Sequence, residues 1–212
     1  MSGHDLWHNL APEIRDLLSK SSQKLEFKRG DFIYRSGDAP RGFYLVEEGL
    51  IAIVIVGANG KDHLMRFFRP GQFFGHRSLF AEQAYHASTQ ALEPTAVRLI
   101  PKSVIFSVLL SHPHLYAPIV QQLALELRQC ELQQVMLLDQ QIMPRVARAV
   151  VYLKDIHPSY RWTRQELAAF CASTTSTVIK VLAELEGMGL LKQRGREIEI
   201  IDRAGLIQMS SS

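Results

Sequence analysis

Residues 163–191 constrain the fold of this chain more than any other segment. Thr163 and Glu166 form the Thr-x-x-Glu pattern of a capping box, which predicts the start of a helix. After a short turn, Ser173 is placed to cap a second helix, which Gly187 ends. Apolar residues recur in this second helix at helical spacing, namely Val178, Val181, Leu182 and Leu185. The segment therefore predicts a helix-turn-helix, whose second helix can enter the major groove of DNA.

The sequence around this motif is consistent with nucleic-acid binding. A hairpin wing is predicted from residues 190–191 and 197–201, joined across Arg194, Gly195 and Arg196. Residues 144–212 carry 10 basic and 7 acidic residues, whereas the rest of the chain carries 14 of each. The whole net charge of +3 thus lies in the segment that holds the helix-turn-helix, where phosphate binding requires it.

The chain before this segment shows two other rhythms. From Lys24 to Ile100, short alternating apolar runs are separated by glycine turns, which predicts a jelly-roll or similar closed β-architecture. After Pro113 the spacing becomes helical. We predict an α+β chain with a β-roll over 1–114, a dimerisation helix over 115–143 and a winged helix-turn-helix over 144–212. Pro144 is expected to end or kink the long helix and to mark a hinge.

The long helix carries a coiled-coil-like pattern of alternating three- and four-residue steps. The residues of this predicted dimer seam are Val120, Leu123, Leu127, Cys130 and Leu137, with Gln134 completing the pattern. A helix packed only on its own domain is the alternative.

Composition excludes several classes of protein. The only cysteines, Cys130 and Cys171, exclude a disulfide framework and favour a reducing cytoplasm. The N-terminus lacks a secretory pattern, and charges interrupt every apolar run before membrane-spanning length. No nucleophile elbow, phosphate-cradling loop or zinc motif is present, so an enzyme is not expected.

A β-roll, a long helix and a winged helix in this order resemble the cyclic AMP receptor protein/FNR family of bacterial transcription regulators. The resemblance covers nearly the whole chain and includes Thr163-Arg-Gln-Glu166, Arg29-Gly-Asp31, Tyr44-Leu-Val46 and Phe74-Gly75. It implies a homodimer that binds double-stranded DNA, with RNA polymerase as a partner if the protein activates transcription.

This sequence differs from the family's nucleotide pocket at two positions. The resemblance places His76 where a ribose-binding Glu is usual, and His86 where a phosphate-binding Arg is usual. A neutral imidazole cannot replace a bidentate guanidinium, so no response to cyclic AMP is predicted. Arg77 could hold a different anion or form an internal ion pair. The candidate effector-pocket residues are Gly75, His76, Arg77, Ser78, His86, Ala87 and Ser88, with Cys130 and Glu131 on the long helix.

No metal or cofactor is predicted. FNR itself uses four cysteines for an iron–sulfur cluster, and this chain has two. His63, His76 and His86 are the candidate ligands for haem or a metal, but their separations differ from local metal-ligand spacings. Haem or another small effector is the alternative.

The expected recognition helix also departs from the family. An Arg or Glu pair with a following Arg is usual, whereas this chain has hydroxyl side chains that discriminate bases poorly. The predicted DNA-contacting residues are Arg164, Gln165, Thr174, Thr175, Ser176, Lys180, Lys192, Arg194 and Arg196. The alternative function is a ligand-binding or protein-interaction module whose helix-turn-helix no longer binds specific DNA.

Overall fold

The computed structural model describes Trp7 and residues 9–210, which form two compact units. The N-terminal unit comprises Met1–Ile55 and Met65–Arg128, and the C-terminal unit comprises Val56–Leu64 and Gln129–Ser212. The boundaries between the units fall at the two ends of Val56–Leu64 and within one long helix, α4 (Tyr116–Asp139).

The N-terminal unit is built from two four-stranded sheets, with strand orders β1-β8-β3-β6 and β2-β7-β4-β5. The pairs β1–β8, β3–β8, β3–β6, β2–β7 and β4–β7 are antiparallel, and most join strands distant in sequence, as in a jelly roll. The strands are β1 (Gln23–Phe27), β2 (Phe32–Tyr34), β3 (Gly42–Glu48), β4 (Ile51–Val56), β5 (Asp62–Phe68), β6 (Phe73–Phe74), β7 (Ser88–Ala91) and β8 (Thr95–Pro101).

The core of the β-roll is unusually aromatic. Both sheets contribute to one cluster of buried side chains, because alternate residues of each strand point inward. The cluster contains Tyr34, Tyr44, Val46, Ile51, Phe68, Phe74, Tyr85, Val97 and Leu99.

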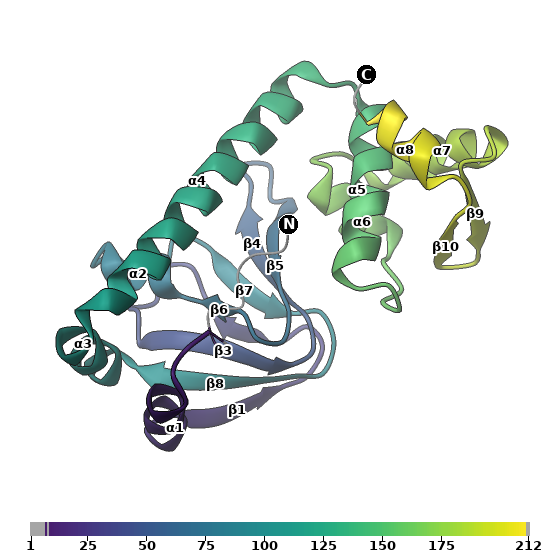
Figure 1. Cartoon of the computed structure of the whole chain (residues 1–212). Coiled ribbons are helices and arrows are strands. Elements are labelled where there is room, and N and C mark those ends of the chain that lie inside the picture. The colour runs from purple at the N-terminus through teal and green to yellow at the C-terminus, as the bar shows by residue number, and fades with distance from the viewer. Residues whose placement is uncertain (1–6, 8, 211–212) are drawn as a thin grey trace. The chain divides into compact units, whose positions relative to one another are not determined.

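A second core joins the helices of this unit to the outer face of β3 and β8. The helices are α1 (Pro12–Lys20), α2 (His76–Phe80), α3 (Lys102–Ser111), the 3-10 turn Pro113–Leu115 and α4. Figure 1 shows α1, α2 and α3 gathered at one end of the sheets. Ile119 of α4 is buried in this core with Ile100 of β8, and Leu123 packs against it. The first turns of α4 are therefore part of the β-roll unit.

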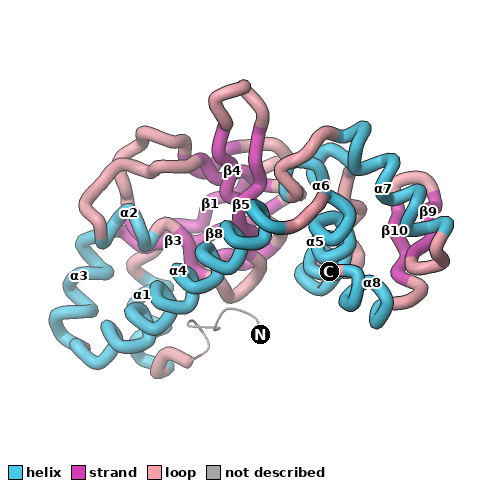
Figure 2. Tube along the Cα trace, turned by 90° about the horizontal axis from the view of Figure 1, so that it is seen from above, coloured by secondary structure: helices cyan, strands magenta, loops and turns pink. Residues whose placement is uncertain are grey.

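The C-terminal unit is mostly helical, with a two-stranded hairpin (Figure 2). Its further elements are α5 (Ile142–Ile156), α6 (Arg164–Phe170), α7 (Thr175–Gly187), β9 (Leu191–Arg194), β10 (Glu197–Ile200) and α8 (Arg203–Met209). Buried apolar side chains of α5, α6 and α7 form its core, and the buried indole N–H of Trp162 donates to the carbonyl of Leu153. The predicted α+β architecture is confirmed.

Two details of the predicted helices are wrong. The long helix ends at Asp139, and Pro144 lies in the first turn of α5. That position suits proline, because the first N–H groups of a helix have no partner within it. The cap of α7 is Thr174 and not Ser173, since the Thr174 hydroxyl accepts from the Thr177 N–H at 3.1 Å.

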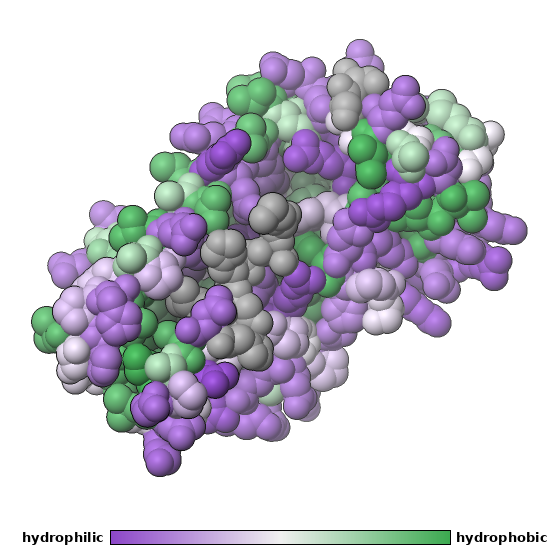
Figure 3. All heavy atoms as spheres, in the orientation of Figure 1, coloured by the Kyte–Doolittle hydropathy of each residue, from purple (hydrophilic) through white to green (hydrophobic). Residues whose placement is uncertain are grey.

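The exposed apolar side of α4 differs in part from the predicted seam. Val120 and Leu127 are 60% and 61% exposed, and Cys130 is also exposed. Leu123 instead packs on its own β-roll, and Leu137 is only half-exposed. Further exposed apolar residues of the helix are Tyr116, Leu125, Leu132, Val135 and Leu138. Figure 3 shows hydrophobic patches along the edge that α4 forms in Figure 1.

Across the residues that the structure describes, no single helix has the length and hydropathy needed to span a bilayer.

Candidate effector pocket and nucleic-acid interface

The predicted effector cassette begins at a tight turn. Gly75 has a φ of +86°, a conformation that favours glycine, and a Cβ there would lie 3.1 Å from the Tyr44 ring and 3.2 Å from the carbonyl oxygen of Gly42. This turn starts α2, so His76 and Arg77 occupy its first two positions. Backbone geometry therefore sets where both side chains point.

Both side chains meet the carboxylate of Glu126 on α4. His76 Nε2 lies 3.3 Å from Glu126 Oε2, and Arg77 Nε donates to the same oxygen at 2.8 Å. Arg66 of β5 donates through Nη2 to Oε1, and Gln122 donates to Oε1 at 2.8 Å. Glu126 is only 2% exposed, so its carboxylate has lost its hydrogen bonds to water. The four side-chain donors replace those hydrogen bonds.

The environment of Glu126 keeps it ionised. Burial alone would raise the pKa of this carboxyl, but hydrogen bonds from His76 and Arg66 outweigh burial and lower the pKa well below its ordinary value. Two arginine side chains that could bind an external anion thus already form ion pairs with an internal carboxylate, which offsets one of their two positive charges.

The interior of the pocket is filled by aromatic side chains. The rings of Tyr34 and Tyr85 stack at a centroid distance of 3.5 Å and an angle of 10°. The remaining cavity, bounded by these rings, Arg66, His76 and Arg77, has a volume of about 20 Å³. This space holds roughly one water, whereas ligand pockets usually measure about 300–1,000 Å³.

The structure brings most of the predicted effector-pocket residues together, but not all. Six of them line the small cavity, namely Gly75, His76, Arg77, Ser78, His86 and Ala87. Ser88 does not line it, and its hydroxyl accepts from the Ser36 N–H at 3.0 Å. Cys130 and Glu131 are exposed, lie further along α4 and do not line this cavity, so their role in an effector pocket stays a prediction.

Sequence reasoning missed Glu126 and Arg66. Glu126 follows Ile119 and Leu123 at steps of four and three, so it continues the buried side of α4. A carboxylate on the buried side of a helix signals a charged partner elsewhere in the fold. The identity of that partner, Arg66 on β5, required the tertiary structure.

The helix-turn-helix begins with the predicted capping box. Thr163 Oγ1 accepts from the Glu166 N–H at 3.1 Å, and Glu166 Oε2 accepts from the Thr163 N–H at 2.8 Å. Val178, Val181, Leu182 and Leu185 are all buried, as predicted. The recognition helix α7 is therefore fixed on its inner face.

The outer face of α7 combines hydroxyl, apolar and basic side chains. Thr175, Ser176 and Lys180 are exposed, and Ile179 is 49% exposed beside them. Sequence reasoning missed Ile179, although its four-residue step from Thr175 was the signal. The Thr174 hydroxyl differs, since capping and contacts of 2.9 and 2.8 Å with the Ser176 and Thr177 hydroxyls occupy it.

Arg164 has a structural position that the sequence did not reveal. Its guanidinium donates to Gln193 Oε1 at 2.7 Å and to the carbonyls of Gly195 and Arg196 at 3.2 and 3.1 Å. Glu186 of α7 accepts from the Gln193 N–H and side-chain amide at 2.7 and 2.9 Å. These bonds tie the wing to α6 and α7, so Arg164 orients the wing rather than standing free for phosphate.

The other predicted DNA-contacting residues lie on the surface of the same unit. Gln165, Lys192 and Arg196 are exposed, and Arg194 forms an exposed ion pair with Glu199 at 3.4 Å. Their contact with DNA stays a prediction. Among the residues that the structure describes, no group of three or more His, Cys, Asp or Glu side chains is placed to hold a metal ion.

We expect Glu126→Gln to lower the free energy of unfolding by about 3 kcal/mol at pH 7, because it removes a buried charge from two arginines. The pKa of Glu126 is lowered in the folded state, so its stabilisation is fully present above the ordinary value of 4.5 and declines as the pH falls below it. Chemical denaturation of both proteins at pH 7 and pH 4 should show the difference narrowing at the lower pH. Glu131→Gln, at an exposed position on the same helix, is the control. If the difference in free energy of unfolding between the two proteins does not depend on pH, Glu126 is not held ionised by its ion pairs as described.

Two family models match the chain. The model for a cyclic nucleotide-binding domain matches residues 24–112, and the model for a Crp-like helix-turn-helix domain matches residues 144–209. The β-roll and the winged unit thus each correspond to a family domain, in the expected order.

The chain is also similar to regulators over nearly its whole length. It is 27% identical to a cyclic AMP receptor protein from Thermus thermophilus, covering 99% of this chain and 98% of the relative. It is 29% identical to the transcriptional regulator SdrP from the same organism, covering 92% and 98%. A crystal structure of a CRP/FNR-family regulator from Thermus thermophilus superposes with a TM-score of 0.76, at 28% identity, over 90% of this chain and 99% of that chain. The chain therefore belongs to the Crp/Fnr family of transcription regulators.

Proposed function

We propose that this Crp/Fnr-type regulator is a homodimer that binds a two-fold-related DNA site and does not respond to cyclic AMP. The observation that carries the second part is the closed pocket of the β-roll. Its cavity of about 20 Å³ is far smaller than a nucleotide, and Arg66 and Arg77 already form ion pairs with Glu126.

Binding of cyclic AMP would require two unfavourable changes at once. The stacked rings of Tyr34 and Tyr85 would have to separate, and the phosphate would have to compete with a carboxylate held by hydrogen bonds. Charge-assisted hydrogen bonds are worth about 1.5–3 kcal/mol each, so displacing the carboxylate is costly. The effector site is therefore altered or absent, and the internal carboxylate takes the place of an external anion.

DNA binding is supported by the exposed side of α7 and the wing tied to it. Thr175, Ser176 and Lys180 can donate to phosphates or base edges, and Ile179 can contact a thymine methyl group. Lys192 and Arg196 add positive charge on the wing. RNA polymerase is the proposed partner where the protein activates. The alternative is a ligand-binding or protein-interaction module without specific DNA binding, which the hydroxyl-rich face of α7 keeps open.

Dimerisation is supported by the exposed apolar side of α4. Val120 and Leu127 are seven residues apart, which places them on one stripe of the helix, and each is about 60% exposed. Large apolar side chains at this spacing match a coiled-coil partner, and a second copy of α4 would cover them.

We expect Leu127→Lys to give monomers at micromolar concentration, because two lysines would face each other in the seam. Sedimentation velocity measures the change. Gln129→Lys, at an exposed position two residues further along the same helix, is the control. A Leu127→Lys variant that stays dimeric would show that the stripe is not the dimer contact.

Cyclic AMP should give no binding heat at micromolar concentrations in isothermal titration calorimetry. The Thermus thermophilus cyclic AMP receptor protein is the positive control. A dissociation constant in the micromolar range or tighter would refute our description of the pocket.

Lys180→Ala should weaken DNA binding, because Lys180 lies one turn beyond Ser176 on the exposed face of α7. Selection from a randomised duplex pool supplies the preferred site, and gel shifts measure the affinity. Loss on that site alone, of about 1–3 kcal/mol, indicates a base contact. Equal loss on all sequences with a shallower salt dependence indicates a phosphate contact.

The control for this experiment is Lys154→Ala, which changes a partly buried lysine of α5 whose ammonium donates to the carbonyl of Pro158. No enriched palindrome, together with unchanged affinity of Lys180→Ala, would favour the module without specific DNA binding.

A further inference from the structure

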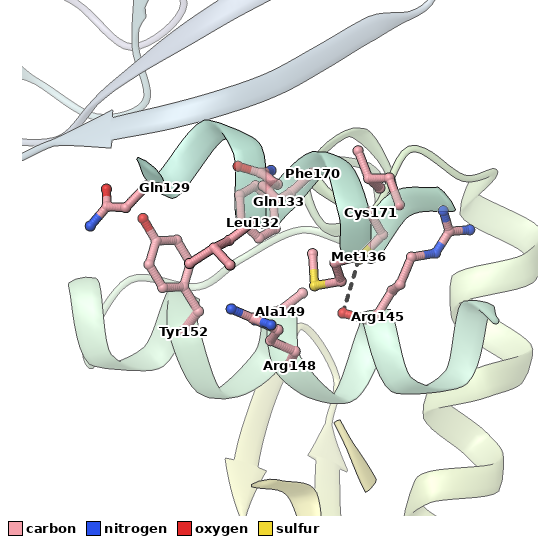
Figure 4. Close-up of a pocket in the computed structure, with 11 residues that line it drawn as sticks. Gln129, Leu132, Gln133, Met136, Arg145, Arg148, Ala149, Tyr152, Phe170 and Cys171 are labelled. Atoms are coloured by element: carbon pink, nitrogen blue, oxygen red, sulfur yellow. Dashed lines mark hydrogen bonds between the residues drawn. The ribbon is translucent and has the colours of Figure 1, made fainter. Parts of the chain in front are cut away.

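A hollow of about 200 Å³ lies inside the C-terminal unit, ten times the volume of the β-roll cavity. The last turns of α4, one side of α5 and the end of α6 surround it (Figure 4). The residues that matter here are Leu132, Met136, Arg145, Arg148, Tyr152 and Phe170. Nothing in the proposed DNA-binding mechanism uses this space.

The walls of the hollow suit a flat apolar group. Tyr152 and Phe170 stack with ring centroids 5.4 Å apart and nearly parallel planes, at 6°. Tyr152 is 42% exposed and Leu132 is 55% exposed, which is high for side chains of this size. Leu132 and Met136 of α4 and Ala149 of α5 also line the hollow (Figure 4). An aromatic ring placed there would contact these side chains and remove their surface from water.

The charge of the hollow is positive and uncompensated. Arg145 and Arg148 line it, and no carboxylate does. Within the described residues, neither guanidinium takes part in an ion pair or a side-chain hydrogen bond, and the Arg145 Nε is buried without an acceptor. Figure 4 shows Arg148 on α5 among the residues that line the hollow. Arg148 is exposed and has no carboxylate partner in the part of the chain that the structure describes, so a carboxylate in the hollow can accept charge-assisted hydrogen bonds from its guanidinium.

The cysteine in the wall does not alter this charge. The thiol of Cys171 is buried and donates to the carbonyl of Arg145 at 3.7 Å. Burial raises the pKa of this thiol to about 12, so it stays protonated and neutral at physiological pH. The hollow therefore keeps two positive charges beside an apolar wall.

We propose that this hollow binds a small aromatic carboxylate, with its ring against Tyr152, Leu132 and Met136 and its carboxylate held by Arg148. The volume of about 200 Å³ is below that of drug-sized sites, so it admits a single substituted ring and not a nucleotide. Phe170 ends α6 and lies five residues before the recognition helix begins, so the ligand contacts the DNA-binding unit directly.

The test is a titration of the full-length protein with benzoate, followed by ligand-observed nuclear magnetic resonance. We expect saturable binding with a dissociation constant in the millimolar range, because benzoate has only about nine non-hydrogen atoms. Benzyl alcohol, which has the ring without the charge, should bind at least about tenfold more weakly, and acetate should not saturate. Absence of benzoate binding, which would follow if a second copy of α4 covered the hollow, overturns the proposal. Equal binding of benzoate and benzyl alcohol also overturns it.

Two variants locate the site. Arg148→Gln should weaken benzoate binding at least about tenfold, because it removes the charged donor. Leu132→Trp should prevent binding by filling the hollow from an exposed position, so it keeps the test decisive if Arg148→Gln fails to fold. Arg161→Gln, an exposed arginine outside the lining, should bind benzoate as the unaltered protein does. Benzoate binding that survives in folded Arg148→Gln or in Leu132→Trp overturns the proposal.

Discussion

The N-terminal unit depends on one set of contacts, the hydrogen bonds and ion pairs that the buried carboxylate of Glu126 forms. This carboxylate joins three elements that are distant in sequence, since Arg66 lies on β5, His76 and Arg77 lie on α2, and Glu126 lies on α4. A buried carboxylate is tolerated only when donors surround it, and the arginines in turn need an anion. The β-roll and the first half of α4 therefore hold each other in one arrangement without an external ligand.

This arrangement supports the proposal that this regulator of the Crp/Fnr family keeps the β-roll without responding to cyclic AMP. The strands still form the roll, and the turn at Gly75 still places polar side chains at the start of α2. The stacked Tyr34 and Tyr85 line the same small cavity as Gly75. The DNA-binding unit depends on a comparable network, in which Arg164 and Glu186 hold Gln193 and the wing turn. In both places, charged residues that could contact a ligand or DNA bind other residues of the protein itself.

The sequence predicted the local elements well, because local rules decide them. The capping box at Thr163 and the buried side of α7 follow from spacing alone. The dimer seam was harder to predict from the sequence, because Leu123 and Leu127 are both apolar and fit the same heptad pattern. Leu123 packs on its own β-roll and Leu127 faces outward, a difference that depends on which side of α4 the β-roll occupies. Cys130 and Glu131 lie at exposed positions of α4 outside the small cavity for the same reason.

The sequence by itself determined the order of the domains, the helix-turn-helix and the absence of the usual charged pair in the nucleotide cassette. These features depend on residue type and on short-range spacing, and both can be read directly from the amino-acid sequence. Only the tertiary structure showed that Glu126 forms ion pairs with Arg66 and Arg77, that Arg164 binds the wing, and that Arg145 and Arg148 line the same hollow. Partners such as Arg66 and Glu126 are separated by 60 residues, and no local pattern records which distant charge a buried group will meet.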